Sequence, residues 1–95
     1  MGFLEFKKQF ESKLEGKIPV ELLELHFMAY AFGNGSIVYK IKGINYQFIF
    51  DGRENLLVCE RSKPHEKYPH CNWEELFAQT GLDVSDKQID LILKA

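Results

Sequence analysis

The sequence predicts a small α+β domain with an N-terminal amphipathic helix, a three- to four-stranded antiparallel β-meander and two short C-terminal helices. Three observations carry this prediction. Apolar residues recur at helical spacing near the start, alternate with polar residues between glycine-bearing turns in the middle, and are preceded by helix-capping patterns near the end. The chain has 95 residues, the size of one domain, and contains no internal repeat or linker. We therefore assign residues 1–95 to a single domain.

The first helix is expected from Phe3 to Leu14. Phe6 and Phe10 lie between these two residues at intervals of three and four, with charged and polar residues separating them. Gly16 follows where a residue in the left-handed conformation commonly ends a helix. The phenylalanines therefore predict one buried helix face.

Two interpretations are open for residues 19–32. Pro19 at a first helical position, the helix formers that follow it and Gly33 beyond the end all permit a helix. The Gly-Asn-Gly-Ser sequence of residues 33–36 instead has the composition of a hairpin loop, which favours a strand from Leu25 to Phe32. Both interpretations leave an α+β domain.

The middle of the chain has the two-residue period of half-buried strands. Residues 37–42 and 46–50 alternate in polarity and are separated by a turn at residues 43–45. Asp51-Gly52 is a strong turn signal, and a further strand is expected from Leu56 to Glu60. Ile37, Tyr39 and Ile41 are expected to share one face of the first strand, and Tyr46, Phe48 and Phe50 are expected to share one face of the second.

The meander is expected to lead into a surface loop and two helices. Residues 61–70 contain two prolines and two histidines and show no regular period, which predicts a loop. The segments Asn72–Glu75 and Ser85–Gln88 both have the spacing of a capping box. They predict a short helix that ends at Gly81 and a final helix after Ser85.

Composition narrows the classes of function. The formal net charge of -2 and the pI of about 5.9 argue against a strong sequence-independent nucleic-acid binder, which usually needs a clustered excess of Lys and Arg. No basic-then-apolar leader opens the chain, and the apolar run Phe27–Phe32 is too short to span a bilayer. We therefore expect a cytoplasmic protein without a membrane segment, with Cys59 and Cys71 as free thiols.

Four zinc-competent side chains, Cys59, His65, His70 and Cys71, lie within thirteen residues. Their spacing, C-x5-H-x4-H-C, matches no common zinc motif. Nearness along the chain also shows neither the lowered thiol pKa nor the positioned base that a cysteine nucleophile needs. We therefore expect no metal site, no cofactor and no catalytic residue.

The aromatic residues of the meander raise an alternative. Aromatic rings beside cations are what a sheet-based single-strand binder needs, although strands that face a core show the same alternation. The alternative is a nucleic-acid-binding or zinc-supported regulatory domain that uses the Cys/His loop of residues 59–71. The rings concerned are Tyr39, Tyr46, Phe48 and Phe50.

The preferred interpretation is a protein-interaction or accessory module without catalytic activity. Its partner is expected to be another protein or a second copy of the chain, rather than nucleic acid or a membrane. Loops on a rigid sheet often carry binding, and Arg, Tyr and Trp are enriched at interface hot spots. The expected contact residues are Arg61, Lys63, His65, Lys67, Tyr68, His70 and Trp73.

Overall fold

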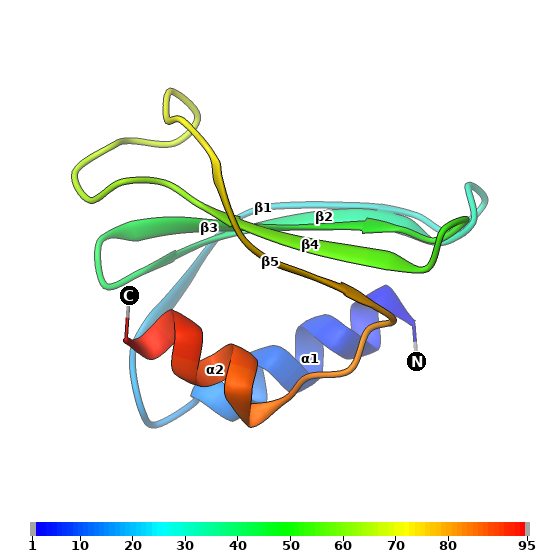
Figure 1. The fold of residues 1–95 in the computed structure, drawn as a ribbon, viewed down its shortest axis with the longest axis horizontal. Coiled ribbons are helices and arrows are strands. Elements are labelled where there is room, and N and C mark those ends of the chain that lie inside the picture. Colours follow the sequence, from blue (N-terminus) through cyan, green and yellow to red (C-terminus); the bar gives the residue numbers. More distant parts are fainter. Residues whose placement is uncertain (1, 95) are drawn as a thin grey trace.

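The computed structural model describes residues 2–94. Within this range, five antiparallel strands form one sheet in the order β1-β2-β3-β4-β5. Two helices pack against this sheet, and both lie on the same face of it (Figure 1). The elements in chain order are α1 (Phe3–Leu14), β1 (Val20–Met28), β2 (Asn34–Ile41), β3 (Ile44–Asp51), β4 (Leu56–Arg61), β5 (Glu74–Thr80) and α2 (Asp86–Leu93). Neither helix is long and apolar enough to cross a membrane.

The predicted α+β class, N-terminal helix and antiparallel meander are confirmed. The prediction of three to four strands and two C-terminal helices is wrong, because Glu74–Thr80 forms strand β5 and only α2 follows it in the described chain. Asn72 does not cap a helix: its backbone N–H and its side-chain amide both donate to the Glu66 carboxylate. The segment after it pairs with β4, so cross-strand pairing outweighs the local capping signal.

The open question at residues 19–32 is resolved as a strand, but the strand runs from Val20 to Met28 and not from Leu25 to Phe32. The predicted hairpin loop is displaced as well. Asn34 and Gly35 belong to β2 and pair with Met28 and Phe27, so the turn lies at residues 29–33. The turn therefore contains Tyr30 and Phe32, which were expected inside the strand.

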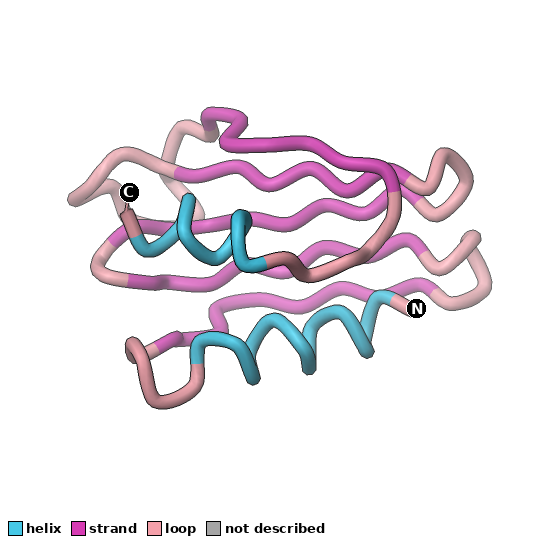
Figure 2. Tube along the Cα trace, turned by 60° about the horizontal axis from the view of Figure 1, so that its bottom comes forward, coloured by secondary structure: helices cyan, strands magenta, loops and turns pink. Residues whose placement is uncertain are grey.

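The core lies between the helices and the sheet face that they cover. Phe3, Phe6 and Phe10 of α1 are each at most 1% exposed, as the helical spacing predicts. The Phe10 and Phe6 rings contact the Phe48 ring edge-on, with centroids 4.8 and 5.3 Å away. Figure 2 shows α1 and α2 side by side on this face. The helices therefore bury the aromatic row of the meander.

Helix α2 begins as its capping pattern predicts. The Ser85 side chain accepts a hydrogen bond from the backbone N–H of Gln88, and the Gln88 side chain accepts one from the backbone N–H of Ser85. Ile89 and Ile92 are then buried against the sheet, while Leu91 lies at the exposed margin. The cap thus places the apolar face of α2 on the core.

A glycine in β2 lets α1 approach the sheet closely. A Cβ atom at Gly35 would overlap the ring of Phe3. That ring is stacked between Phe27 and Phe50, at 6.2 Å from each ring centroid, and these two residues are the cross-strand neighbours of Gly35. The N-terminal end of α1 is therefore seated on a position that requires the absence of a side chain.

Candidate functional site

The loop of residues 62–73 lies on the sheet face opposite the helices, and its root is fixed by two buried polar residues (Figure 1). Ser62 donates from its backbone N–H to the Asn45 carbonyl at 2.9 Å, and Asn45 donates from its own N–H to Ser62 Oγ at 3.1 Å. The Asn45 side-chain amide donates to the carbonyl of Glu66 at 2.9 Å. The loop, which the chain joins to β4 and β5, is thus also tied to β3 by hydrogen bonds of Asn45 and Ser62.

The Glu66 carboxylate joins the two ends of this loop. It accepts hydrogen bonds from the Lys63 N–H at 2.9 Å and, through its other oxygen, from the N–H and side-chain amide of Asn72 at 3.3 and 3.2 Å. These donors, the Lys63 N–H first among them, hold the pKa of Glu66 below its ordinary value. The carboxylate therefore closes the loop in its ionised form.

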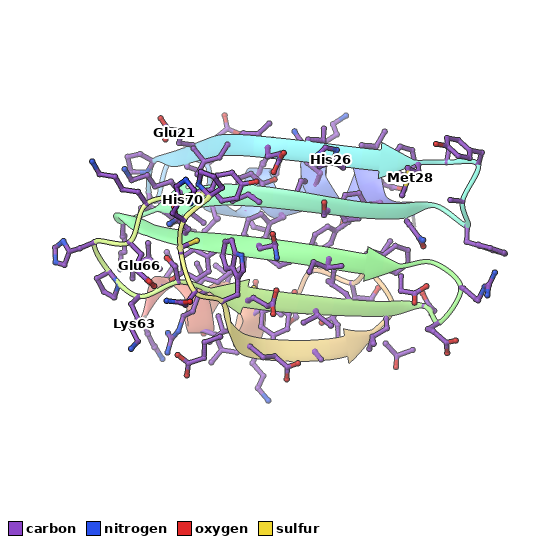
Figure 3. The ribbon with its side chains drawn as sticks, turned by 90° about the horizontal axis from the view of Figure 1, so that it is seen from above. Glu21, His26, Met28, Lys63, Glu66 and His70 are labelled. Atoms are coloured by element: carbon purple, nitrogen blue, oxygen red, sulfur yellow. The ribbon has the colours of Figure 1, made fainter. Side chains whose placement is uncertain are left out.

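Six of the residues predicted to contact a partner lie in the 62–73 loop, whereas Arg61 lies on the helix side of the sheet, where it lines a pocket with residues of α2. The side chains of Lys63, His65, Lys67 and His70 are exposed, and His70 lies over the open face of the sheet (Figure 3). Tyr68 and Trp73 are half-buried, with ring centroids 6.3 Å apart, and Arg61 ends β4. The geometry is compatible with a contact site, and the contact itself stays a prediction.

The Cys/His set does not converge on a metal site. Cys59 is fully buried in the core under the helices, whereas Cys71 lies in the loop on the opposite face. Among the described residues, no group of three or more His, Cys, Asp or Glu side chains could hold a metal ion. Burial raises the pKa of both thiols, which reduces the thiolate that a nucleophile requires.

The aromatic row considered as a stacking platform belongs to the core. Tyr39, Tyr46 and Phe48 are at most 1% exposed and Phe50 is 8% exposed. The two tyrosines anchor helices: Tyr39 Oη donates to the Glu11 carboxylate at 2.7 Å, and Tyr46 Oη donates to a carbonyl of α2 at 3.3 Å. These four rings are therefore not accessible to a nucleic-acid base.

Most of the exposed large hydrophobic residues lie in a segment that the sequence did not single out. Ten large hydrophobic residues are exposed in the described part of the chain, and six of them lie between residues 22 and 32. We call residues 22–32 the β1 edge segment, because among the described strands β1 pairs only with β2 and forms one border of the sheet. The six exposed residues are Leu22, Leu25, Phe27, Met28, Tyr30 and Phe32.

The turn at the end of the β1 edge segment is held in place. Arg53 lies over the Phe32 ring, 4.5 Å from its centroid, and the Asn34 side-chain oxygen accepts a hydrogen bond from Gly52 N–H at 2.7 Å. Phe32 is 62% exposed and Tyr30 is 90% exposed. The apolar side chains are therefore presented on an ordered turn that the β3–β4 turn supports.

A groove of about 580 Å³ runs between α1 and β1 on the same side of the molecule. Its apolar wall is formed by Ile18, Val20 and Leu22, and its charged wall includes Lys7 and Glu11, which form an ion pair at 2.8 Å. The groove adjoins the N-terminal half of β1. It thus adds a concave surface to the β1 edge segment.

The sequence held only a weak signal for this surface. The run from Leu22 to Phe32 is apolar without a clean period, and a strand that is buried on one face reads much like a helix at this length. The border position of β1 depends on how many strands pair and in what order, which is a property of the whole sheet.

No family model, curated protein or solved structure matched the chain. Function is therefore inferred from the surface of the chain itself.

Proposed function

We propose that the protein is a small protein-interaction or accessory module and that its principal contact is the β1 edge segment. The observation that carries the proposal is the concentration of six exposed large apolar side chains in eleven consecutive positions of a border strand and its turn. A concentration of exposed apolar side chains of this kind marks contact sites, because its exposure to water costs free energy that a partner's surface removes.

The hairpin turn between β2 and β3 determines which backbone groups of β2 face β1. Lys42 and Gly43 form a two-residue turn, and both have positive φ, at 55° and 75°. In a turn of this type the flanking residues, here Ile41 and Ile44, exchange two backbone hydrogen bonds. Pairs then alternate along the ladder, so odd-numbered residues of β2 bond to β3 and even-numbered residues direct their N–H and C=O groups toward β1.

The same alternation identifies the free backbone groups of β1. Glu24, His26 and Met28 are opposite even-numbered residues of β2 and direct their backbone groups toward it. Leu25 and Phe27 lie between them and direct their N–H and C=O groups away from the sheet. The border of the molecule therefore offers unpaired backbone groups and apolar side chains at the same positions, which is the combination that strand addition uses.

The exposed basic residues of the 62–73 loop give a second, separable contact. Lys63 and Lys67 are exposed, and the loop that carries them is tied at both ends through Glu66. The loop borders the start of β1, where Lys67 and Leu23 line one pocket, whereas Leu25 and Tyr30 lie further along β1 and in its turn, so separate variants distinguish the two contacts.

The proposal is tested by measuring binding of the immobilised full chain to the chain itself and to proteins of a cell extract. Leu25→Ser and Tyr30→Ser are expected to abolish the contact. Leu91→Ser is the matched control, because Leu91 and Leu25 are both 39% exposed but Leu91 lies on α2. Loss of binding only in the double variant Lys63→Ala, Lys67→Ala would show that the contact lies in the loop. Failure of the chain to bind any protein would refute the proposed function.

A further inference from the structure

We propose that the partner of the β1 edge is β1 of a second copy of this chain, paired antiparallel about a two-fold axis at Leu25. The two five-stranded sheets then become one continuous sheet. This inference rests on the proposed function and names the partner of the same surface. Such an interface is isologous, so the strand has to be complementary to itself.

The backbone of β1 fits this axis. Leu25 directs its N–H and C=O away from β2, so two copies of Leu25 placed opposite each other form a pair with two reciprocal hydrogen bonds. In Figure 3, β1 forms the outer margin of the sheet, and α1 lies beneath the sheet instead of beyond that margin. The approach of a second strand in the plane of the sheet is therefore open.

The polar side chains of β1 are complementary under the same two-fold rotation. With Leu25 opposite Leu25, Glu24 of each copy lies opposite His26 of the other. Within one chain, His26 Nε2 already lies 2.9 Å from Glu24 Oε1. Pairing places a carboxylate on both sides of each imidazole and sets no two carboxylates directly opposite each other. This arrangement stabilises cross-strand pairs.

The apolar side chains are covered in the same arrangement. Leu22, Leu25 and Phe27 lie on the face of β1 that turns toward the helices, yet they are 44, 39 and 37% exposed because no element covers their outer side. Antiparallel pairing about Leu25 sets Phe27 of each strand opposite Leu23 of the other, next to the bulge between Leu22 and Glu24 that leaves Leu22 on the same face as Phe27. There the Phe27 ring of one copy lies next to the groove between α1 and β1 of the second copy.

The opposite border of the sheet does not offer a comparable surface. Strand β5 begins with Glu74 and Glu75, and no residue of β5 is among the exposed large hydrophobic residues of the described chain. Two acidic side chains side by side on each copy disfavour self-pairing there. The inference therefore concerns β1.

Disulfide trapping tests the axis directly. In a Cys71→Ser background, Leu25→Cys is expected to form a covalent dimer under mild oxidation, because Cα atoms of a hydrogen-bonded pair lie about 5.5 Å apart, within the range of a disulfide. Leu56→Cys is the matched control, since Leu56 is also 39% exposed but lies on β4. Equal cross-linking of the two variants, or none in Leu25→Cys, would overturn the proposed axis.

Sedimentation of the full chain provides the second test, with circular dichroism as the check on folding. The unmodified chain is expected to be dimeric and Leu25→Pro monomeric but folded, since the Leu25 N–H makes no bond to β2. Glu24→Lys is expected to weaken the dimer by roughly tenfold, and addition of His26→Glu is expected to restore it.

The outcomes separate the two proposals. A chain that is monomeric at every concentration but captures another protein through Leu25 and Tyr30 refutes self-pairing and leaves the proposed function standing. A dimer that survives Leu25→Pro unchanged overturns the β1 interface. A monomer that captures nothing refutes both.

Discussion

At the scale of single residues, two small features position much larger segments. The Glu66 carboxylate collects three hydrogen bonds from the two ends of the 62–73 loop, and Gly35 provides the space in which the Phe3 ring lies. Glu66 acts through its charge, and Gly35 acts through the absence of a side chain. Each predicts a measurable response to a one-residue change.

The loop is expected to loosen in acid. Because the pKa of Glu66 is lowered in the folded chain, its carboxylate stabilises the loop at pH values above the ordinary glutamate pKa, and this contribution is lost as the pH falls through the lowered value. The N–H resonances of Lys63 and Asn72 should therefore titrate together in NMR spectra, with a midpoint below that of an ordinary glutamate. Glu66→Gln should remove this transition. A midpoint at or above the ordinary value would contradict the proposed role of the carboxylate.

Gly35→Ala is expected to lower the free energy of unfolding by about 1–3 kcal/mol, because the new methyl group displaces the Phe3 ring from its place between Phe27 and Phe50. Urea unfolding measures the change. Ser36→Ala is the control, since Ser36 is next in β2 and faces the other side of the sheet, and its effect should stay within about 0.5 kcal/mol. Equal effects of the two changes would show that Phe3 is not seated as described.

At the scale of elements, α2 depends on its first turn. The helix has only eight residues, a length at which a helix is marginal without capping and tertiary packing. Its capping box therefore supplies a large share of its local stability. The buried Ile89 and Ile92 supply the packing.

Ser85→Ala should destabilise the protein by about 1 kcal/mol, because the backbone N–H of Gln88 loses its acceptor at the helix start. Thermal or urea unfolding followed by circular dichroism is the measurement. Ser12→Ala, at an exposed position within α1, should be neutral or slightly stabilising, since alanine is the better helix former. A Ser85→Ala variant as stable as Ser12→Ala would contradict the role of the cap.

Elements with a strong local signal could be predicted from the sequence. The phenylalanine spacing of α1, the Ser85 cap of α2 and the alternation in β2 and β3 are each decided by neighbours within a few residues. The sequence left β1 open between a strand and a helix and predicted a helix in place of β5, because both segments carry helix-compatible residues and become strands through pairing with β2 and β4. Distant contacts overrode local preference there.

The candidate site also has one part that local sequence predicts and one part that depends on distant contacts. The exposed loop with its basic residues was predictable from its prolines and its lack of period, and residues 62–73 do connect β4 to β5 as a loop. The β1 edge segment was not predictable, since it is defined by the strand order of the complete sheet. A residue such as Leu25 has the same local sequence whether its strand lies at the centre or at the border.

At the scale of the whole molecule, the two faces and the two borders of the sheet differ in what covers them. The helices cover one face, and the 62–73 loop crosses part of the other (Figure 1). The β5 border begins with two glutamates, whereas the β1 border carries apolar side chains and outward-directed backbone groups. The uncovered border at β1 is the central feature of the proposed function.

Amide hydrogen exchange tests this feature most directly. The outward-directed N–H of Leu25 should exchange rapidly in dilute protein and become protected as the chain concentration rises, while the N–H of His26, directed toward β2, should be protected at every concentration. The Asp83 N–H, in the exposed connection between β5 and α2 and outside the β1 edge segment, serves as an unprotected reference. A Leu25 N–H that exchanges at the same fast rate at all concentrations, with or without a captured protein, would contradict the account.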